Sequence, residues 1–244
     1  MCGRYASSQD VAAIMSEFDV EESFAPALAP NYNVAPTNGV YAVVERPAKE
    51  ERPQQRQLRE LTWGLVPSWS KDTSIGNRLI NARLETAATK PSFRRAFERR
   101  RAIIPADGYY EWYAASSGPK PKKQPYFIAP EDGSILAMAG LYEIWRDPNK
   151  AEDDADRFHW SMTIITTSAT DDLGRIHDRM PLMLDRDAYT GWLDPRMTNV
   201  EEVSALLKPA MLGRLRAVPV GPLVSNVRNN GPELIRPIPI EGEF

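Results

Sequence analysis

Reactive side chains are scarce in this sequence of 244 residues, which contains one cysteine and two histidines. A lone cysteine excludes a disulfide within the chain, and this favours a reducing, cytoplasmic location. The same count excludes a zinc site built from two or more thiolates of this chain. Any nucleophilic thiol chemistry therefore has to use Cys2, with His159 and His177 as the available imidazoles.

The sequence also lacks a surplus of positive charge and any long apolar run. Its formal net charge of -3 at pH 7 argues against a uniformly basic coat for nucleic acid, but leaves local basic patches open. The longest apolar runs, such as Ile135 to Tyr142, are too short to span a bilayer, and the first residues do not resemble a signal peptide. We therefore expect a soluble protein with no membrane association.

Proline is abundant by contrast, and its 21 residues are spread along the chain. Frequent proline favours short elements joined by turns. Four segments rich in aromatic and β-branched residues are expected to be strands: Tyr109 to Tyr113, Pro125 to Ile128, Ile135 to Trp145 and Trp160 to Thr167. The intervening segments 116–123, 131–133 and 147–157 resemble hairpin loops, which predicts an antiparallel meander that could close into a barrel.

Helical periodicity is weaker and predicts only short helices, at Gln9 to Phe18, Pro91 to Arg100, Asp187 to Leu193 and Glu201 to Leu207. The polar stretch Arg46 to Glu60 is expected to be a surface loop rather than a domain boundary. No internal repeat is present. The predicted fold class is α+β, with one domain over residues 1–244, a mostly antiparallel β-barrel-like core and a few short helices.

Charge is distributed unevenly along the chain. The segment Arg78 to Arg101 carries eight basic residues, and the acidic segment Asp147 to Asp156 offsets them in the total. Arginines near Trp63 and Trp69 suit single-stranded nucleic acid, because guanidinium groups pair with phosphates and aromatic rings stack on bases. The alternative is that the run Arg94 to Arg101 is simply a solvated helix face, which is the commoner use of such runs.

Cys2 is informative because of its position. Removal of Met1 would leave a thiol and a free α-amine on the same residue, with reference pKa values of about 8.5 and about 8. Such a 1,2-aminothiol condenses with an aldehyde through its amine, and addition of the thiol then closes a five-membered thiazolidine ring. The alternative is that Cys2 is a small buried hydrophobic residue near a chain end.

Three further polar residues have sequence contexts that suit catalysis. Asn81 lies with Arg83 and Glu85 on a segment expected to be extended. Glu111 lies among aromatics on an expected strand, where desolvation would raise its pKa toward that of a general acid. His177 lies in a polar loop, the usual location of functional residues. Taken alone, Glu111 could equally be a cross-strand ion-pair partner and His177 a capped loop residue.

Seven short motifs occur in one consistent order: Cys2 to Tyr5, Asn31 to Pro36, Trp63 to Trp69, Asn81 to Thr86, Asp107 to Trp112, His177 to Pro181 and Asn226 to Asn229. This set closely resembles the SOS-response-associated peptidase (SRAP) family, and the resemblance covers essentially the whole chain. One departure is that Ser70 follows Trp69, where family members can carry two adjacent tryptophans, so part of a stacking wedge is expected to be missing.

The resemblance implies the SRAP fold and a sensor of abasic sites in single-stranded DNA, acting in the SOS response to DNA damage. Cys2 would form a thiazolidine crosslink with the ring-opened sugar, Asn81 would orient its reacting groups, Glu111 would shuttle protons and His177 would act as an acid during ring opening. The implied DNA contacts are Arg4, Asn33, Pro36, Trp69, Arg83, Thr166, Arg179 and Asn226. Lyase activity and self-removal of the residue before Cys2 would accompany crosslinking.

The resemblance also sets expectations for partners. It implies a monomer that binds single-stranded DNA containing abasic sites, associates with the nucleoid if bacterial, and could meet replication-fork proteins. The implied chemistry requires no metal and no organic cofactor. Two other functions remain open: a thiol peptidase that acts on other proteins, with His177 as base, and a non-catalytic module that binds single-stranded DNA.

Overall fold

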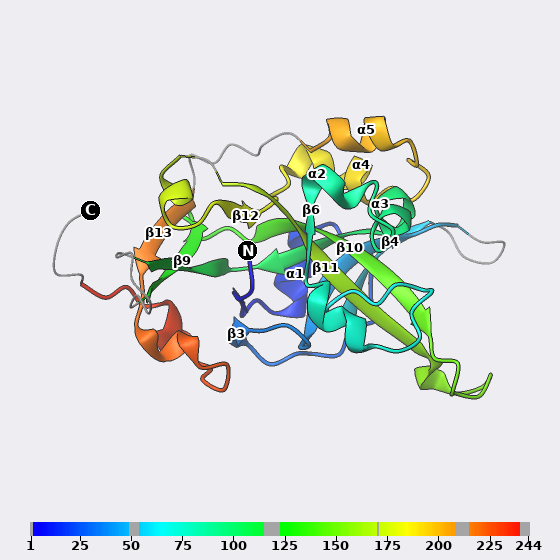
Figure 1. Cartoon of the computed structure of the whole chain (residues 1–244), viewed down its shortest axis with the longest axis horizontal. Coiled ribbons are helices and arrows are strands. Elements are labelled where there is room, and N and C mark those ends of the chain that lie inside the picture. Colours follow the sequence, from blue (N-terminus) through cyan, green and yellow to red (C-terminus); the bar gives the residue numbers. More distant parts are fainter. Residues whose placement is uncertain (1, 49–53, 115–122, 170, 208–214, 240–244) are drawn as a thin grey trace.

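The computed structural model describes residues 2–48, 54–114, 123–169, 171–207 and 215–239, and its centre is a β-barrel (Figure 1). Within these residues, a sheet in the order β12-β11-β10-β7-β4-β5-β2 closes where β5 pairs with β11. The closing pair is parallel, with Thr62 opposite Ser161 and Trp63 opposite Met162, so the barrel of β11, β10, β7, β4 and β5 is mixed. Closure removes the exposed edges that an open sheet would leave.

The strands of this sheet alternate between two apolar faces. Val43 points outward to the helices, whereas Ala42 and Val44 point into the barrel with Met138 and Ile164. The bounds are β2 Glu22–Ser23, β4 Gly39–Arg46, β5 Gln55–Trp63, β7 Arg101–Ala106, β10 Leu136–Arg146, β11 Phe158–Ser168 and β12 Arg179–Pro181, with β6 Asn81–Arg83 parallel to β11.

A second, antiparallel sheet lies against one end of the barrel, with the strand order β13-β9-β8-β1-β3. Its bounds are β1 Tyr5–Ser7, β3 Asn31–Val34, β8 Gly108–Ala114, β9 Lys123–Pro130 and β13 Leu215–Pro219. The chain passes directly from β7 of the barrel into β8 of this sheet through Asp107. The N-terminal segment therefore lies where the two sheets meet.

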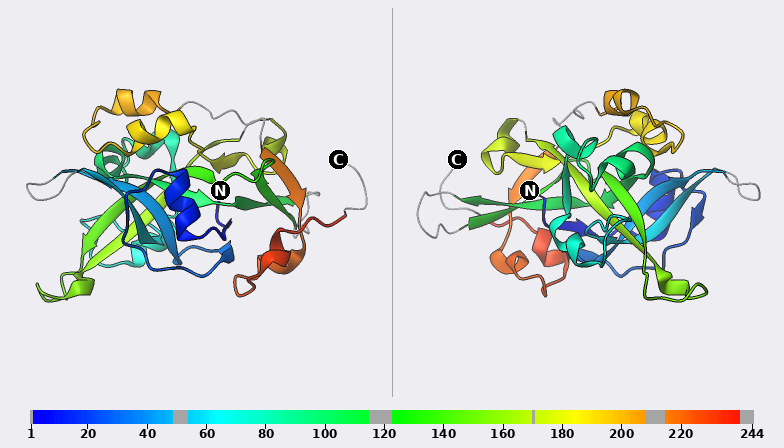
Figure 2. Two further views of the ribbon diagram at one scale, coloured as in Figure 1. Left: turned by 180° about the vertical axis from the view of Figure 1, so that it is seen from behind. Right: turned by 45° about the vertical axis from the view of Figure 1, so that its right-hand side comes forward.

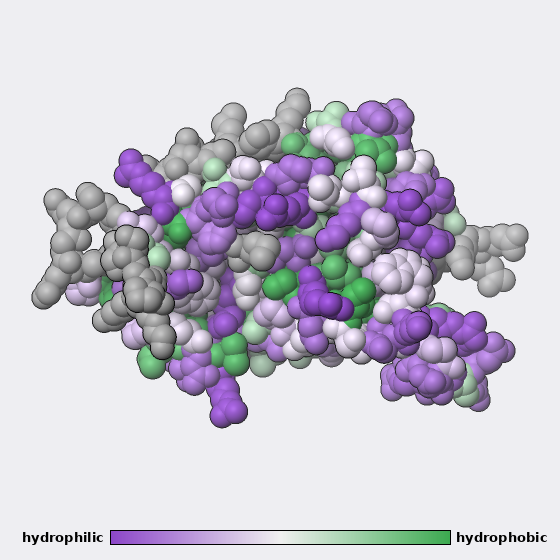
Figure 3. All heavy atoms as spheres, in the orientation of Figure 1, coloured by the Kyte–Doolittle hydropathy of each residue, from purple (hydrophilic) through white to green (hydrophobic). Residues whose placement is uncertain are grey.

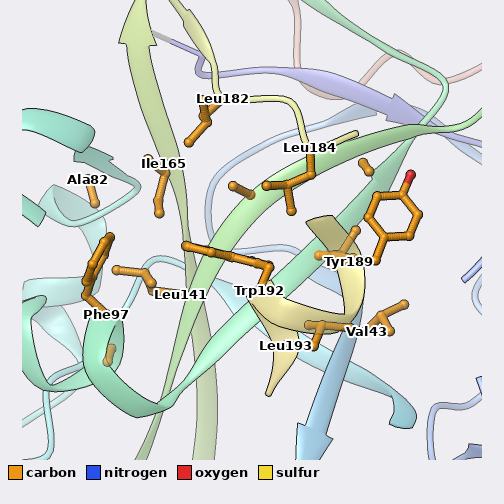
Figure 4. Close-up of a cluster of buried hydrophobic side chains, with 14 of the residues drawn as sticks. Val43, Ala82, Phe97, Leu141, Ile165, Leu182, Leu184, Tyr189, Trp192 and Leu193 are labelled. Atoms are coloured by element: carbon orange, nitrogen blue, oxygen red, sulfur yellow. The ribbon is translucent and has the colours of Figure 1, made fainter. Parts of the chain in front are cut away.

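Short helices cover the outer face of the barrel: α1 Val11–Glu17, α2 Leu84–Ala87, α3 Arg94–Arg99, α4 Tyr189–Leu193 and α5 Val200–Ala205. In Figure 4, Trp192 of α4 and Phe97 of α3 point toward Leu141 and Ile165 of the barrel strands. Arg101 fastens these helices, because its guanidinium donates to backbone carbonyls that include those of Phe97, Trp192 and Asp194. A buried arginine that uses its donors in this way is a structural clamp.

Most of the expected elements are confirmed. Strands β8, β9, β10 and β11 cover the four predicted segments except Ile135, since β10 begins at Leu136, and the structure has the predicted barrel core with short helices. Helices α1, α3, α4 and α5 fall within the predicted segments or begin one residue earlier. The acidic segment 147–157 does connect an antiparallel hairpin, β10 to β11. Within the described residues, no helix is long and apolar enough to cross a membrane.

Three expectations are wrong. The meander breaks between β9 and β10, because the turn at 131–133 carries the chain from one sheet to the other instead of closing a hairpin. The stretch Arg46 to Glu60 is not one loop, since Gln55 to Glu60 forms β5 opposite β4. Glu85 is not on an extended segment but in the first turn of α2. The expected loop at 116–123 lies outside the described residues except for Lys123, which begins β9.

The β10–β11 hairpin tip and the C-terminal turns lie at opposite ends of the molecule in all views (Figure 2). The C-terminal turns are the 3₁₀ segments Pro222–Ser225 and Pro232–Ile235, which pack near β3 and β9. The junction between the sheets, with the N-terminal segment, lies between these ends (Figure 1). This arrangement brings residues that are distant in the sequence, including Asn81, Tyr109 and Glu111, close to Cys2.

Candidate functional site at the N-terminal cysteine

Cys2 is fully buried in the apolar cluster that fills the barrel. Its backbone carbonyl accepts a hydrogen bond of 2.7 Å from Nδ2 of Asn81, at the start of β6. The other amide atom, Oδ1 of Asn81, is buried and has no hydrogen-bond partner among the described residues. Because buried polar atoms are nearly always paired in folded proteins, this oxygen is a site where a ligand atom could donate.

Glu111 lies on β8, which pairs with β1, the strand that follows Cys2. Its side chain is 5% exposed, and burial raises the pKa of the carboxyl to about 7, with a smaller contribution from the carboxylate of Asp178. A carboxyl group with a pKa near the ambient pH can both donate and accept a proton during a reaction. The expectation that desolvation would raise its pKa is therefore confirmed.

The pKa of the Cys2 thiol is shifted in the opposite direction from that of a peptidase nucleophile. Burial raises its pKa well above the ordinary value, and the nearby charge of Glu111 raises it further. The thiol is therefore protonated at neutral pH, and it becomes a nucleophile only if a base removes its proton during the reaction. Glu111 is a carboxyl group whose charge acts on this thiol.

His177 lies just before β12, and its Nδ1 accepts a hydrogen bond of 3.0 Å from the backbone N–H of Arg179. The same nitrogen is 3.0 Å from Oδ1 of Asp178, which can accept from Nδ1 when the ring is protonated. Burial lowers the pKa of His177, so the neutral ring predominates at neutral pH, and its proton then lies on Nε2. In either state Nδ1 has a partner that fixes the ring.

Arg179 and Thr166 form one connected structure on β12 and β11. The guanidinium of Arg179 makes a two-pronged ion pair with Glu85, at 2.6 and 3.0 Å, and donates to the backbone and hydroxyl oxygens of Thr166. Arg83 lies opposite Thr166 on β6 and is exposed, and its guanidinium makes no hydrogen bond or ion pair with the described residues. Of these two arginines, Arg83 is the one available to a phosphate.

Arg4, Asn33 and Asn226 connect the N-terminal segment to the C-terminal turn. Arg4 donates to Oδ1 of Asn33 at 2.7 Å and to the carbonyl of Val224, and it lies 5.7 Å from the ring of Trp112. Asn33 is buried and donates to the carbonyls of Val224, Asn226 and Asn229. These bonds fix the turn that carries Asn226, whose side chain is exposed.

The two tryptophans of the Trp63 to Trp69 motif differ completely. Trp63 is fully buried in the barrel, and its Nε1 donates to the carbonyl of Ile80 at 2.9 Å, so it cannot stack on a nucleic-acid base. Trp69 is 60% exposed and therefore can. Pro36 is half-buried in the turn after β3, where the N–H of Thr37 donates to the carbonyl of Trp63. The suggestion that both tryptophans serve bases is wrong for Trp63.

Two tyrosines also surround Cys2 and were not predicted from the sequence. Tyr5 and Tyr109 are buried, and the pKa of each is raised by burial and then by the charge of Cys2. The hydroxyl of Tyr5 has no hydrogen-bond partner among the described residues, and its ring packs 5.2 Å from that of Trp63. Both belong to motifs already noted, but only the fold shows that their rings line the pocket.

The structure thus brings Cys2, Asn81 and Glu111 into one cluster, which we call the Cys2 pocket. His177 lies just before β12, and the charge of its neighbour Asp178 reaches Glu111. The expected DNA contacts are of two kinds. The side chains of Trp69, Arg83 and Asn226 are exposed. Those of the second kind make hydrogen bonds within the protein, and they are Arg4, Asn33, Thr166 and Arg179. Among the described residues, no group of three or more His, Cys, Asp or Glu is placed to hold a metal ion.

Comparisons with known proteins find relatives that match this chain over most of its length. A family model described as SOS response associated peptidase (SRAP) matches residues 1–227. The chain is 37% identical over 237 residues to the abasic site processing protein YoqW of Bacillus subtilis (strain 168), covering 96% of this chain and 99% of that protein. It is 36% identical over 246 residues to the abasic site processing protein YedK of Escherichia coli (strain K12), covering 98% and 100%. An X-ray structure of a protein from Bacteroides thetaiotaomicron has a TM-score of 0.80 at 26% identity, covering 97% and 100%.

Proposed function

The chain belongs to the SRAP family, and from this premise we propose that it senses abasic sites in single-stranded DNA and crosslinks to them through Cys2. The observation that carries the proposal is the burial of Cys2 beside a carboxyl group with a raised pKa, with its carbonyl held by Asn81. The relatives named above are abasic site processing proteins, and their similarity extends over almost the whole chain.

The first step uses the amine that removal of Met1 would expose on Cys2. This amine adds to the aldehyde carbon of the ring-opened sugar and forms a carbinolamine. The raised thiol pKa favours this order, because the thiol is protonated at neutral pH while an α-amine with a pKa of about 8 is partly neutral. The bond from Asn81 to the carbonyl of Cys2 fixes the residue that carries both nucleophiles.

Glu111 then moves protons in both directions. Its protonated carboxyl gives a proton to the carbinolamine hydroxyl, which leaves as water and produces an iminium ion. The resulting carboxylate takes the proton of the thiol as the sulfur attacks the iminium carbon, and the electron pair of that double bond returns to nitrogen. The net reaction loses one water, forms one C–N and one C–S bond, and restores the protonated carboxyl. A pKa of about 7 suits both roles.

His177 acts earlier, on the closed sugar. Its protonated ring, the minor form at neutral pH, would give the Nε2 proton to the ring oxygen as that oxygen leaves the anomeric carbon, while a water molecule takes the proton of the anomeric hydroxyl, so that the ring opens to the aldehyde. Arg179 and Asp178 hold Nδ1 and so fix the direction of this donor. The same iminium intermediate permits β-elimination of the 3′ phosphate, so slow lyase activity would accompany crosslinking. Self-removal of the residue before Cys2 would use the same pocket.

DNA would bind mainly through sequence-independent contacts. Arg83 would pair with a phosphate next to the abasic sugar, because it is exposed beside Asn81 and has no ion-pair partner among the described residues. Trp69 would stack on a neighbouring base, and Pro36 and Asn226 would line the path of the strand. Arg4, Asn33, Thr166 and Arg179 would support this channel through their internal bonds and could add contacts when DNA binds.

A general thiol peptidase is a weaker candidate. Such enzymes activate a thiolate by lowering its pKa, usually beside a protonated histidine. Here burial raises the pKa of Cys2 and lowers that of His177, so both groups are shifted away from a thiolate–imidazolium pair. The same two shifts are compatible with an amine nucleophile followed by base-assisted attack of the thiol.

The proposal is tested by mixing the processed protein with abasic single-stranded DNA and separating the products by denaturing electrophoresis without a reductant. We expect a stable adduct from the wild-type protein. We expect none from Cys2→Ala, which should retain salt-sensitive binding to the strand. A Cys2→Ser control retains the amine and a hydroxyl, so it should give only an imine that borohydride traps. An equal yield of stable adduct from Cys2→Ala would overturn the proposal.

A further inference from the structure

A second feature lies on the outer side of the barrel, where α3 and α5 meet. A groove of about 500 Å³ is lined by Ala88, Val200 and the α3 residues Arg94, Arg95, Glu98 and Arg99. We call it the α3 groove. It is separate from the Cys2 pocket, and its three arginines are all exposed.

Two of these arginines have guanidinium groups without a direct partner. Arg99 is 2.9 Å from Glu98, whereas the guanidinium groups of Arg94 and Arg95 make no hydrogen bond and no ion pair with any residue that the structure describes, and Arg95 acts on Glu143 through its charge alone. Other arginines nearby are fully engaged, since Arg101 donates to backbone carbonyls and Arg100 pairs with Glu143. The α3 groove therefore presents unneutralised positive charge in a concave surface, which is an arrangement that attracts polyanions.

The charges of Arg94 and Arg95 do not stabilise helix α3. Arg94 and Arg95 occupy the first turn of α3, where positive side chains oppose the helix dipole, and Phe93 provides no side-chain cap. The neighbouring helix α5 has the favourable pattern, with Asn199 as cap and Glu201 and Glu202 in its first turn. Because the stability of α3 does not account for its arginines, an interaction with an anion is the better explanation.

The α3 groove is also connected to the Cys2 pocket by a short run of chain. The path starts at Asn81, passes the exposed Arg83, and reaches Ala88 after β6 and α2. Three strand residues and four helical residues have a length along the chain of about 16 Å, which corresponds to about five nucleotides of a strand at B-form spacing. The surface over β6, α2 and α3 is mostly hydrophilic on the face shown in Figure 3.

We infer that the α3 groove binds the phosphodiester backbone of the same DNA strand whose abasic site lies at Cys2, several nucleotides away from the lesion. This inference rests on the proposed function and adds a second contact region to it. Arg83 would contact the strand near the lesion, and Arg94 and Arg95 would contact it farther along. The contact would be independent of base sequence, because α3 offers only guanidinium groups to the phosphates.

The test compares two abasic substrates and three proteins. One substrate has about two nucleotides on each side of the lesion, too few to reach the α3 groove, and the other has about fifteen. The proteins are the wild type, Arg94→Ala/Arg95→Ala, and the control Arg146→Ala/Arg186→Ala. The control removes the same charge from two exposed arginines that pair with Glu152 and Glu17. The apparent second-order crosslinking rate is measured below saturation at several salt concentrations.

We expect Arg94→Ala/Arg95→Ala to crosslink the long substrate about tenfold more slowly, with a salt slope reduced by about 1.4 because two phosphate contacts are lost. The short substrate should react at the wild-type rate, and the control should resemble the wild type on both. The melting temperature of the double variant should be unchanged or slightly higher, since a dipole repulsion is removed.

An unchanged rate and salt slope for Arg94→Ala/Arg95→Ala on the long substrate would overturn the inference and leave the proposed function intact. An equal loss on the short substrate would also overturn it, because the arginines would then act at the lesion. If no protein forms an adduct, the proposed function fails instead. In that case the affinity of each protein for an undamaged single strand of the longer length is measured instead. Equal affinities of the wild type and Arg94→Ala/Arg95→Ala would overturn the inference about the α3 groove.

Discussion

The Cys2 pocket and the α3 groove both contain ionisable groups. Those of the pocket are buried, and those of the groove are exposed to water. Cys2 exposes 0% of its surface and Glu111 exposes 5%, whereas Arg94 and Arg95 lie on the surface. Burial shifts pKa values and so prepares proton transfer, and exposure leaves arginines charged but screened by salt. We therefore expect the Cys2 pocket to control the rate of reaction, and the α3 groove to control DNA affinity and its salt dependence.

The largest effect is expected from Glu111→Gln, which should slow adduct formation about a hundredfold or more while leaving DNA affinity nearly unchanged. The amide is close in size to the carboxyl but cannot exchange protons at neutral pH. Single-turnover rates at saturating protein measure the first quantity, and titration of undamaged strand measures the second. A rate unchanged within twofold would remove Glu111 from the mechanism.

The pH dependence of the same reaction sharpens this prediction. The wild-type rate should rise as the α-amine loses its proton near pH 8 and should fall as Glu111 loses its proton above its pKa of about 7. The two limbs produce a maximum between about pH 7 and pH 8. In Glu111→Gln the alkaline limb should disappear. A wild-type rate that continues to rise to pH 9 would contradict the role of the protonated carboxyl.

A smaller effect is expected from Asn81→Ala, about tenfold in rate, because one hydrogen bond to the carbonyl of Cys2 is lost. Asn81→Asp is the matched comparison, since it retains the size and the acceptor but lacks the Nδ2 donor. Both variants should lower the saturated rate and leave the salt slope of binding as it is. A changed salt slope with a normal rate would move Asn81 from the chemistry to DNA binding.

The smallest effects are expected from two arginines, Arg83, whose guanidinium has no ion pair among the described residues, and Arg179, whose guanidinium is bonded to Glu85 and Thr166. Arg83→Ala should weaken binding with a salt slope lower by about 0.7 and leave the melting temperature unchanged. Arg179→Ala should lower the unfolding free energy by about 1 kcal/mol, because the contacts with Glu85 and Thr166 are lost.

The stability difference for Arg179→Ala should depend on pH. The ion pair lowers the pKa of Glu85, so its contribution is complete above the unfolded-state value and is lost as the pH falls through the lower folded-state value. Urea unfolding of wild type and variant between pH 7 and pH 3 measures this. The difference in unfolding free energy between wild type and Arg179→Ala should become smaller as the pH falls. A difference that stays constant would show that Arg179 stabilises the fold without the charge of Glu85.

Much of the fold could be predicted from local patterns. The four central strands and the short helices follow from apolar periodicity and propensity, because each is a property of neighbouring residues. The sheet assignment could not be predicted, since the turn at 131–133 has the composition of a hairpin and only long-range pairing directs β10 to β7. Gln55 to Glu60 resembled a loop because five of its six residues are polar, and only the fold shows that Arg56 and Gln57 are buried in the strand.

The candidate site shows the same limit. The motifs identified Cys2, Asn81, Glu111 and His177, and the desolvation of Glu111 could be anticipated from its aromatic neighbours. The buried position of Trp63, the internal bonds of Arg179 and Arg4, and the free state of Arg94 and Arg95 among the described residues depend on the fold. The number of charged residues can be read from the sequence, but which of them are already paired can be read only from the structure.

The most direct test of the central claim is intact mass spectrometry of the protein before and after exposure to abasic single-stranded DNA, without a reductant. We predict a chain that lacks Met1 and a product whose mass equals that chain plus the DNA minus one water, with the modification on Cys2 after digestion. An adduct on a lysine, an adduct that appears only after borohydride treatment, or no mass change in a chain that begins with Cys2 would contradict the account.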